Sequence, residues 1–436
     1  MESFKKFSLF TLPKYCRTSL QPVKEFHELI GRPGLKYKTI HVTGTNGKGT
    51  VCNKIAKILS QAGFRTGLFT SPHLVKFNER ICISGEQISD EDLFEIEHDL
   101  MEKYHALPEP QLVVFDMITM IALKYFEIQK VDFAVLEVGI GGDLDSTNIV
   151  KPECSVITSI GLDHRDILGN TKEEISQAKC GIFKENTPIV IGSDCPQEHM
   201  VNFLKENLEA DDSLIHLIDS KPNSIEEENQ EIARRVVNIL KDRDFQISDS
   251  AIKQGLLEKV PGRFQQFSKN IFYDGAHNPD GIRKSISSVF NLLPKDFDRN
   301  VTVVCGFTRE ANLDENISAV LENENIDKID TIYFCENSPG EPEMINFQPS
   351  CIKLDKIESL LGDMVHEKLK VLSKSAEGEF ESIELHSLTD KTTLISHLED
   401  VLTYLQNDPK FQENYIFVFG TFRLYKDLYE YSQMNQ

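Results

Sequence analysis

The stretch KTIHVTGTNGKGTVCNKIAKIL, from Lys38 to Leu59, joins an apolar β-type run to a helical pattern through a loop with three glycines and one lysine. A strand, a glycine-rich turn and a helix N-terminus form an anion site, because unpaired backbone N–H groups and the helix dipole both point at the ligand. Lys48 would add a positive charge at the outer phosphates, and the Thr50 hydroxyl lies close enough to assist a metal. The stretch therefore predicts a phosphate-binding α/β domain.

The spacing of this loop differs from the usual phosphate loop, G-x-x-x-x-G-K-[ST]. Val42 stands six positions before Lys48, and Gly49 separates the lysine from Thr50. The loop is therefore not a standard Walker A loop, which argues against a plain P-loop kinase. A glycine turn with an incidental lysine is the alternative, and it is disfavoured because a strand precedes the loop and a helix follows it.

Short apolar runs alternate with helical patterns along the chain, among them FAVLEVGI, CSVITSI and TPIVIG, then NVTVVCG, DTIYFC and NYIFVFG. This alternation predicts parallel α/β sheets, which bind ligands at the carboxyl ends of their strands. A chain of 436 residues is too long for one ordinary core, so two domains are expected. Pro261 and Gly262 end a helical stretch, which places the boundary between 260 and 261.

Two further expectations concern the surface. The helix after the loop is predicted to be amphipathic, with Lys54 and Lys57 on the side opposite an apolar stripe of Val51, Ile55, Ile58 and Leu59. From about 310 to 382 the chain is polar and rich in turn-forming residues, so we expect an acidic surface elaboration on the second domain.

Composition excludes several classes of protein. A net charge of −22 would repel a phosphate backbone, so no nucleic-acid partner is expected. No apolar run approaches the ~20 residues of a membrane helix, and the first residues are too polar for a secretory signal. The nine cysteines stand singly, which suits reduced thiols. These features predict a cytoplasmic protein with no membrane partner.

Polar side chains follow three of the predicted strands: Ser71 after one, Glu137 at the end of FAVL, and His164 after CSVITSI. Ends of adjacent parallel strands converge, so a hydroxyl, a carboxylate and an imidazole could hold Mg²⁺ beside phosphate oxygens. A single histidine at a strand end is more often a satisfied hydrogen-bonding residue. The set is stronger evidence for a metal site than any member alone.

Three more stretches have two readings each. GIGGDLDSTN is either a solvent loop or part of a site. Arg263, in PGRF at the predicted boundary, is either a phosphate clamp or a surface ion pair. Asp274, His277 and Asn278, in DGAHNP, read most simply as a helix N-cap with turn residues before Pro279.

Taken in order, HVTGTNGKGT, GLFTSPHLVKFNERICISGEQIS, LEVGIGGDLDSTN, GLDHRDILGNT, AKCGIFK, PGRF and DGAHNP resemble the motif series of the folylpolyglutamate synthase and dihydrofolate synthase family, within the Mur ligase superfamily. The resemblance implies an N-terminal P-loop-type ATPase domain with a parallel sheet (1–260) and a smaller Rossmann-like α/β domain (261–436). It also implies an ATP- and Mg²⁺-dependent ligase that joins L-glutamate to a pteroate or folate carboxyl group through an acyl phosphate.

Carried over by position, the resemblance implies roles for individual residues. ATP would be bound by Gly44, Thr45, Asn46, Gly47, Lys48, Gly49, Thr50, Arg263, Asp274 and His277. The metal would be bound by Ser71, Glu137, His164 and Lys179, the last matching a lysine that the family carbamylates. Lys48, His164 and Lys179 would be catalytic, and the pteroate or folate would contact Phe115, Asp116, Leu144, Asp145 and Ser146.

The chain also differs from the family pattern. Asp143 replaces a common arginine, and the segment from Val113 to Asp116 replaces Thr-x-Phe-Glu. Ala233 stands where the family commonly has an asparagine that helps hold the adenine. Because Asp145 is kept, we favour both activities, in a monomer. The rivals are a monofunctional enzyme of either type, a Mur-type cell-wall ligase, which lacks the SPHL…NERI run, and a non-catalytic nucleotide-binding protein.

Overall fold

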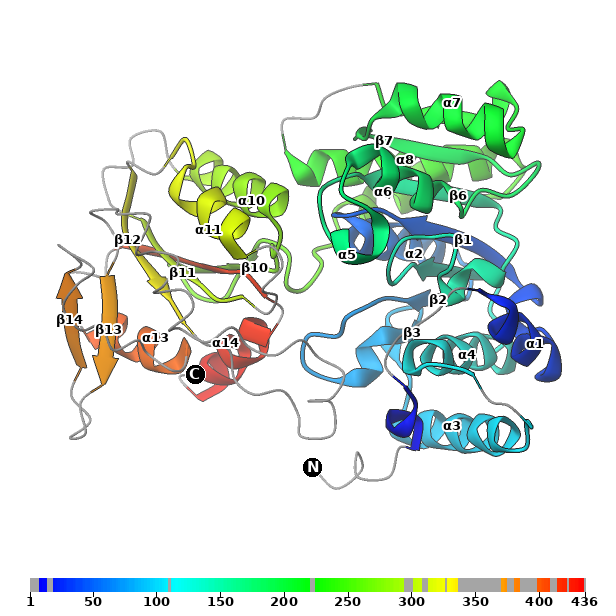
Figure 1. Ribbon diagram of the computed structural model, residues 1–436, viewed down its shortest axis with the longest axis horizontal. Coiled ribbons are helices and arrows are strands. Elements are labelled where there is room, and N and C mark those ends of the chain that lie inside the picture. Colours follow the sequence, from blue (N-terminus) through cyan, green and yellow to red (C-terminus); the bar gives the residue numbers. More distant parts are fainter. Residues whose placement is uncertain are drawn as a thin grey trace. The chain divides into compact units, whose positions relative to one another are not determined.

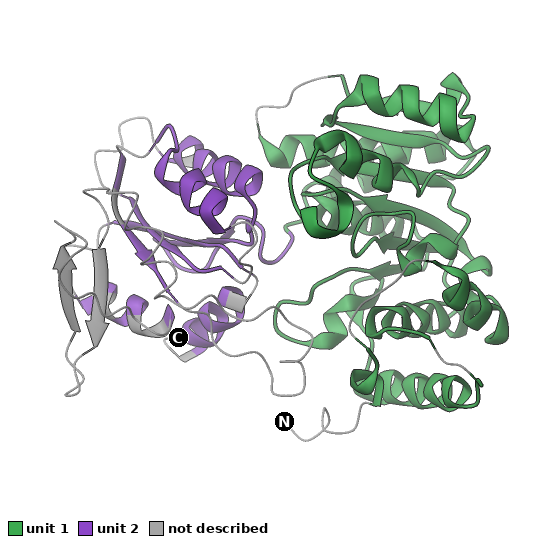
Figure 2. Ribbon diagram, viewed as in Figure 1, with its two compact units in different colours: residues 1–259 green, residues 260–436 purple. Residues whose placement is uncertain are grey.

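The computed structural model describes residues 8–13, 19–108, 111–219, 224–293, 301–307, 313–325, 328–335, 370–374, 380–384, 398–407, 414–421 and 423–434. The chain divides into two compact units, Met1–Lys259 and Val260–Gln436, which have different colours in Figure 2. Each unit has its own sheet and its own hydrophobic core. The α/β class that the sequence predicts is confirmed.

Unit 1 is built on an eight-stranded sheet with the order β4-β3-β2-β5-β1-β6-β7-β8 (Figure 1). The strands are β1 (Lys38–Thr43), β2 (Thr66–Phe69), β3 (Ile81–Ile83), β4 (Glu86–Gln87), β5 (Phe133–Glu137), β6 (Cys154–Ser159), β7 (Ile189–Asp194) and β8 (Ile215–Leu217). The short strands β3 and β4 run antiparallel to their neighbours, and the other pairings are parallel. Because β1 lies between β5 and β6, the loops after these three strands leave the same edge of the sheet.

Helices cover both faces of this sheet. On one face, α2 (Lys48–Gln61), α8 (Ile225–Asp242) and α9 (Asp249–Leu256) share a core with β1, β5 and β6. On the other, α4 (Val114–Ile128) packs on β2, while α6 (Lys172–Cys180) and α7 (Gln197–Leu208) pack on β6 and β7. Unit 1 also contains α1 (Gln21–Leu29), α3 (Asp90–His105) and the short α5 (Arg165–Leu168).

Helix α2 is more buried than its sequence pattern predicts. The expected apolar stripe is fully buried, but the side chain of Lys54 is buried as well. The reason is that α8 and α9 cover this side of α2, and three acceptors replace water around the ammonium. Lys54 Nζ donates to Glu226 Oε1 at 2.7 Å, to the Leu256 carbonyl at 2.7 Å and to the Glu258 carbonyl at 3.1 Å. Placing Lys54 on a polar side of the helix is therefore wrong.

This contact predicts a measurable stability difference between two lysines of one helix. Lys54→Met should lower the free energy of unfolding by about 2 kcal/mol, because it leaves buried carbonyl groups without their donor. Lys57→Met is the matched control, since Lys57 is partly exposed and its pair with Glu258 (3.3 Å) is worth at most about 1 kcal/mol. Urea unfolding followed by circular dichroism measures both. Equal midpoints for the two variants would contradict the assigned role of Lys54.

Unit 2 has a smaller sheet with the order β12-β11-β15-β10-β9 (Figure 1). Its strands are β9 (Gln265–Gln266), β10 (Ile271–Asp274), β11 (Val301–Cys305), β12 (Ile329–Phe334) and β15 (Tyr415–Phe419), parallel apart from β9. The helices are α10 (Pro279–Leu292), α11 (Leu313–Leu321), α13 (Leu398–Asn407) and α14 (Arg423–Met434). A separate antiparallel hairpin joins β13 (Lys370–Lys374) to β14 (Phe380–Glu384).

The first part of the range 310–382, predicted to be a surface elaboration, belongs to the core of unit 2 instead. Helix α11 and strand β12 lie within this range, yet Leu313, Ile317, Ile329 and Ile332 belong to the core of unit 2. Apolar residues at helical and strand spacing explain this burial despite the polar sequence around them. The stretches 336–369 and 375–379 lie outside the described residues.

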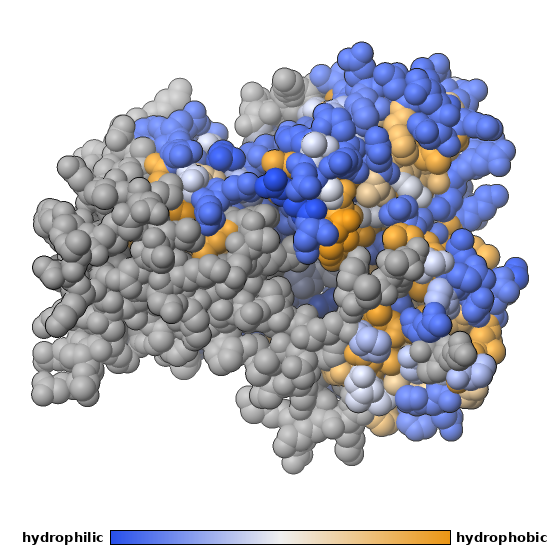
Figure 3. All heavy atoms as spheres, viewed as in Figure 1, coloured by the Kyte–Doolittle hydropathy of each residue, from blue (hydrophilic) through white to orange (hydrophobic). Residues whose placement is uncertain are grey.

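Each helix in the part of the chain that the structure describes is too short or too polar to cross a membrane. On the face in Figure 3, hydrophilic side chains (blue) cover most of the described surface, with apolar side chains (orange) between them.

Candidate active site

The loop after β1 has the shape of an anion site. Gly44 (φ 152°) lies so close to Thr158 that a Cβ atom would be 1.9 Å from the threonine Oγ1. Gly47 (φ 87°) has a left-handed backbone and directly precedes α2. As the N-cap residue, Gly47 has no side chain that could cap the first turn of α2. The N–H groups of that turn are therefore directed at the mouth of the loop, where an anion would bind.

Two lysines converge on this loop. Lys48 Nζ donates to the carbonyls of Gly44 (2.9 Å) and Thr45 (3.1 Å), and Lys179 Nζ, from the end of α6, donates to the same Gly44 carbonyl at 2.9 Å. Lys179 is buried, and burial together with the positive charge of Lys48 lowers the pKa of Lys179 to about 7, while Asp163 acts in the opposite direction. Both predicted catalytic lysines therefore lie at the glycine loop after β1.

The end of β5 faces the start of α2. The Glu137 carboxylate is buried next to Gly49, since a Cβ atom at Gly49 would lie 3.5 Å from Glu137 Oε2. The same carboxylate accepts the backbone N–H of Ser71 at 2.9 Å. Within the described residues, no three His, Cys, Asp or Glu side chains form a metal cluster. The predicted set contains only one carboxylate and one imidazole, so a metal here would rely on the Ser71 hydroxyl, Lys179 and substrate oxygens as well.

His164 follows β6 and has an unusual backbone. Its φ of 52° is left-handed, which is uncommon for a residue other than glycine, and it directly precedes α5. Its N–H donates to Asp163 Oδ1 at 2.8 Å. Such strain often marks a functional position. The loop after β6 thus brings both His164 and Asp163 to the edge that carries Lys179.

The loop after β5, residues 138–148 (hereafter the β5 loop), is organised around one buried carboxylate. Asp145 Oδ2 accepts the N–H groups of Gly139 (3.0 Å) and Ile140 (3.2 Å). Asp145 Oδ1 accepts the Thr147 N–H at 3.0 Å and the Thr147 hydroxyl at 2.5 Å. Burial raises the pKa of Asp145, and these hydrogen bonds oppose that change. The Asp145 side chain therefore holds its own loop together.

Of the other predicted pteroate residues, Leu144 and Ser146 belong to this loop and Phe115 and Asp116 to α4. Phe115 packs on Gly139, where a Cβ atom would lie 2.7 Å from the phenylalanine ring. Leu144 is 38% exposed, and the Ser146 hydroxyl is buried. Asp116 is buried in the first turn of α4 and accepts the Val113 N–H at 2.9 Å. Of this set, Leu144 presents an exposed apolar side chain, whereas the carboxyl groups of Asp116 and Asp145 are hydrogen-bonded inside unit 1.

The three predicted ATP residues of unit 2 lie close together after the unit boundary. Asp274, at the end of β10, accepts the N–H of Phe264 at 2.9 Å and of Ala276 at 3.0 Å. This brings Arg263, the neighbour of Phe264, close to the loop that contains His277. Asn278 caps α10 by accepting the Gly281 N–H at 2.9 Å. The cap is thus the asparagine, while Asp274 joins the two loops.

Two residues near the site have no role in the sequence-based assignment. Asn229, on α8, is buried with its Oδ1 against Gly47, one turn before Ala233, which lies in the apolar core. In the sequence, Asn229 interrupts the apolar stripe of α8, and this interruption could have indicated a functional role for it. Arg80 is the second: burial lowers its pKa to about 10, and Glu137 and Glu79 oppose this. With that pKa the guanidinium is charged at neutral pH and attracts Glu137, and its Nε donates to His73 Nδ1 at 2.9 Å.

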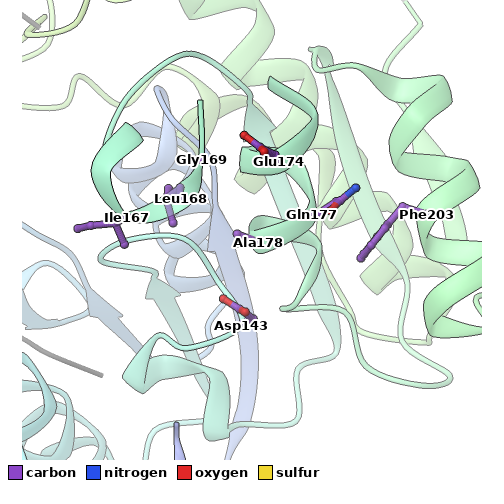
Figure 4. A pocket seen from close by; sticks show the side chains of 8 residues that line it. All are labelled: Asp143, Ile167, Leu168, Gly169, Glu174, Gln177, Ala178 and Phe203. Atoms are coloured by element: carbon purple, nitrogen blue, oxygen red, sulfur yellow. The ribbon is translucent and has the colours of Figure 1, made fainter. Parts of the chain in front are cut away.

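A pocket of about 520 Å³ opens beside α6, on the surface of unit 1 (Figure 4). In Figure 4 the side chain of Asp143 approaches it from the β5 loop, and those of Glu174 and Gln177 from α6. The backbone N–H of Asp143 donates to the Ala178 carbonyl at 3.0 Å, which ties the β5 loop to the residue before Lys179. The pocket is lined by Asp143, Ile167, Leu168, Gly169, Glu174, Gln177, Ala178 and Phe203.

Comparison with known proteins agrees with this geometry. The Mur ligase middle domain matches residues 42–248. The chain is 34% identical to the dihydrofolate synthase/folylpolyglutamate synthase of Bacillus subtilis over 305 residues, which cover 62% of this chain and 71% of that protein. The chain belongs to the dihydrofolate synthase/folylpolyglutamate synthase family. It is also 33% identical to the folylpolyglutamate synthase of Lacticaseibacillus casei, over 64% of this chain and 72% of that protein.

A solved bifunctional folylpolyglutamate synthase/dihydrofolate synthase with Mn, AMPPNP and L-glutamate bound is similar over nearly the whole length. It matches 97% of this chain and 96% of its own, with a TM-score of 0.75 and 25% identity. The predicted family, the fold and the class of ATP-dependent ligase are thereby confirmed.

Proposed function

We propose that this chain joins L-glutamate to two kinds of acceptor, 7,8-dihydropteroate and folates, at the expense of ATP. The observation that carries the proposal is the convergence of Lys48 and Lys179 on the Gly44 carbonyl, beside the buried carboxylate of Glu137. This arrangement gathers two lysine nitrogens and one hard oxygen ligand where phosphates would lie. The family membership names the acceptors.

In the proposed reaction the γ-phosphoryl group passes from ATP to the acceptor carboxylate, which gives an acyl phosphate and ADP. The amine of L-glutamate then attacks the carbonyl carbon, phosphate leaves, and an amide remains. Gly44 to Thr50 cradle the phosphates, and Lys48 stabilises the charge on the outer ones. Arg263, Asp274 and His277 are assigned to ATP binding as well.

The residues after β2, β5 and β6 suit Mg²⁺. Glu137 and Ser71 offer hard oxygen ligands and His164 an imidazole, and magnesium takes few protein ligands beside substrate phosphates. When bound, Mg²⁺ neutralises charge on the phosphate oxygens. The ammonium of Lys179 would repel a cation, whereas a carbamate at Nζ would bind one. A neutral amine is needed for carbamylation, and the pKa of about 7 supplies one above neutral pH.

The acceptor is assigned to the β5 loop and α4, with Phe115, Asp116, Leu144, Asp145 and Ser146 forming its surroundings. Asp116 and Asp145 act by shaping the backbone, as their hydrogen bonds indicate. We further propose that the enzyme works as a monomer in the cytoplasm.

The test is ADP release by the purified protein with Mg²⁺, ATP and L-glutamate, in separate reactions with 7,8-dihydropteroate and tetrahydrofolate. Release with both acceptors supports the bifunctional reading. Release with one shows a monofunctional enzyme and directs attention to Val113, Val114 and Asp143. Release with neither, from folded protein supplied with bicarbonate, would contradict the proposed acceptors.

A further inference from the structure

A buried chain of hydrogen bonds connects the middle of β1 to the β5 loop. His41 is fully buried, and its Nε2 lies 2.8 Å from Thr147 Oγ1. Thr147 Oγ1 lies in turn 2.5 Å from Asp145 Oδ1. The neighbours of His41 along the strand, Ile40 and Val42, are apolar and fully buried. A buried central strand favours an apolar β-branched residue such as valine at position 41, so packing alone does not explain the histidine.

The acceptors fix the direction of this chain. Four donors point at the two oxygens of Asp145, as an ionised carboxylate requires. The Thr147 hydroxyl therefore donates to Asp145, and its oxygen accepts from Nε2–H of His41. The ring is neutral, because burial, and secondarily the charge of Lys184, lowers the pKa of His41 to about 3. Nδ1 is then an unprotonated acceptor, and among the described residues it has no hydrogen-bond partner.

The chain of hydrogen bonds ends in the β5 loop, which contains the predicted acceptor residues Leu144, Asp145 and Ser146. Asp145 sets the positions of the Gly139 and Ile140 backbone. Gly139 supports the Phe115 ring, which lies 6.0 Å from the Phe69 ring. A shift of Asp145 would therefore move both Gly139, on which Phe115 packs, and the exposed Leu144 that precedes Asp145 in the sequence.

We propose that His41 is a positioning residue for the acceptor substrate, acting through Thr147 and Asp145 to hold the β5 loop in its binding conformation. The inference rests on the proposed function, because it assigns the acceptor to this loop. His41 touches no substrate; its contribution is to fix the hydroxyl of Thr147, which in turn fixes the carboxylate.

The test compares variants that keep or remove each hydrogen bond. His41→Leu and Thr147→Val should raise the KM for dihydropteroate or tetrahydrofolate by about 10- to 100-fold, since small misplacements near a site have effects of that size. The KM values for ATP and L-glutamate should stay within about twofold. His41→Gln, whose amide nitrogen can replace Nε2–H, and Thr147→Ser, which keeps the hydroxyl, should restore most of the acceptor affinity.

Thr39→Val is the matched control. Thr39 lies two residues before His41 on the same face of β1, is fully buried, and its hydroxyl has no hydrogen-bond partner among the described residues. This variant should leave all three KM values unchanged. His41→Leu combined with Thr147→Val should cost little more than either alone, because both break one chain.

Three results would overturn the inference. A lowered unfolding temperature with unchanged acceptor KM would make His41 a purely structural residue. A shift in the Mg²⁺ requirement would mean that the hydrogen-bond chain acts on Glu137. An equal rise in all three KM values would mean that the effect of His41 is not specific to the acceptor. Wild-type protein that turns over neither acceptor would overturn the proposed function itself, and the wild type is therefore measured first.

Discussion

Replacing Lys48 by methionine should lower kcat by about 10²- to 10³-fold while the protein stays folded, because removing one preorganised donor for transition-state charge has this cost. The Lys48 ammonium already lies over the loop, bound to the carbonyls of Gly44 and Thr45. It can therefore turn from these carbonyls to a phosphate over a short distance. Methionine keeps an unbranched side chain of similar length and removes both the charge and the hydrogen-bond donors of Nζ.

Steady-state ADP release measures this effect, and circular dichroism confirms the fold. Lys57→Met is the matched control on the same helix, and it should keep its activity within about twofold, since Lys57 contacts Glu258 at a partly exposed position. A Lys48→Met variant with undiminished turnover would remove Lys48 from the catalytic assignment. Full activity with a raised KM for ATP would limit Lys48 to ground-state binding.

The general placement of this site was readable from the sequence. Parallel strands converge at their carboxyl ends, so Gly44 after β1, Glu137 at the end of β5 and His164 after β6 had to lie at one edge once the alternating pattern was recognised. Strand and helix periodicity are local properties of the sequence, so they can be recognised without knowledge of the tertiary structure.

The details that depend on packing could not be read in this way. The burial of Lys54 results from α8 and α9, which begin more than 150 residues further along the chain. The inward orientation of Asp145 follows from the turn of its own loop, in which four donors meet its carboxylate. Asn229 reaches Gly47 only because α8 packs beside α2. Lys54 and Asn229 thus depend on long-range contacts, and Asp145 on the detailed turn of its loop, and a pattern of residue types encodes neither.

Lys179 should be the second residue whose loss nearly abolishes activity. Lys179→Ala removes the proposed carbamate, and kcat should fall by about 10²-fold or more, as expected for loss of a ligand in a site that relies on few protein ligands. Lys172→Ala, in the first turn of the same helix, is the matched control and should remain active. If a carboxylate is the group that matters, added formate or acetate should partly rescue Lys179→Ala but not Lys48→Met.

The modification itself has a pH signature. Burial and Lys48 lower the pKa of Lys179 to about 7, so the amine that reacts with CO₂ is mostly protonated at pH 6 and mostly neutral at pH 8. At a fixed concentration of dissolved CO₂, reactivation of CO₂-depleted enzyme should therefore accelerate as the pH rises through about 7. In Lys48→Met the neighbouring positive charge is gone, the pKa of Lys179 should rise, and carbamate formation, followed by ¹³C NMR with labelled CO₂, should need a higher pH. An unmodified Lys179 in fully active wild-type enzyme would refute the carbamate.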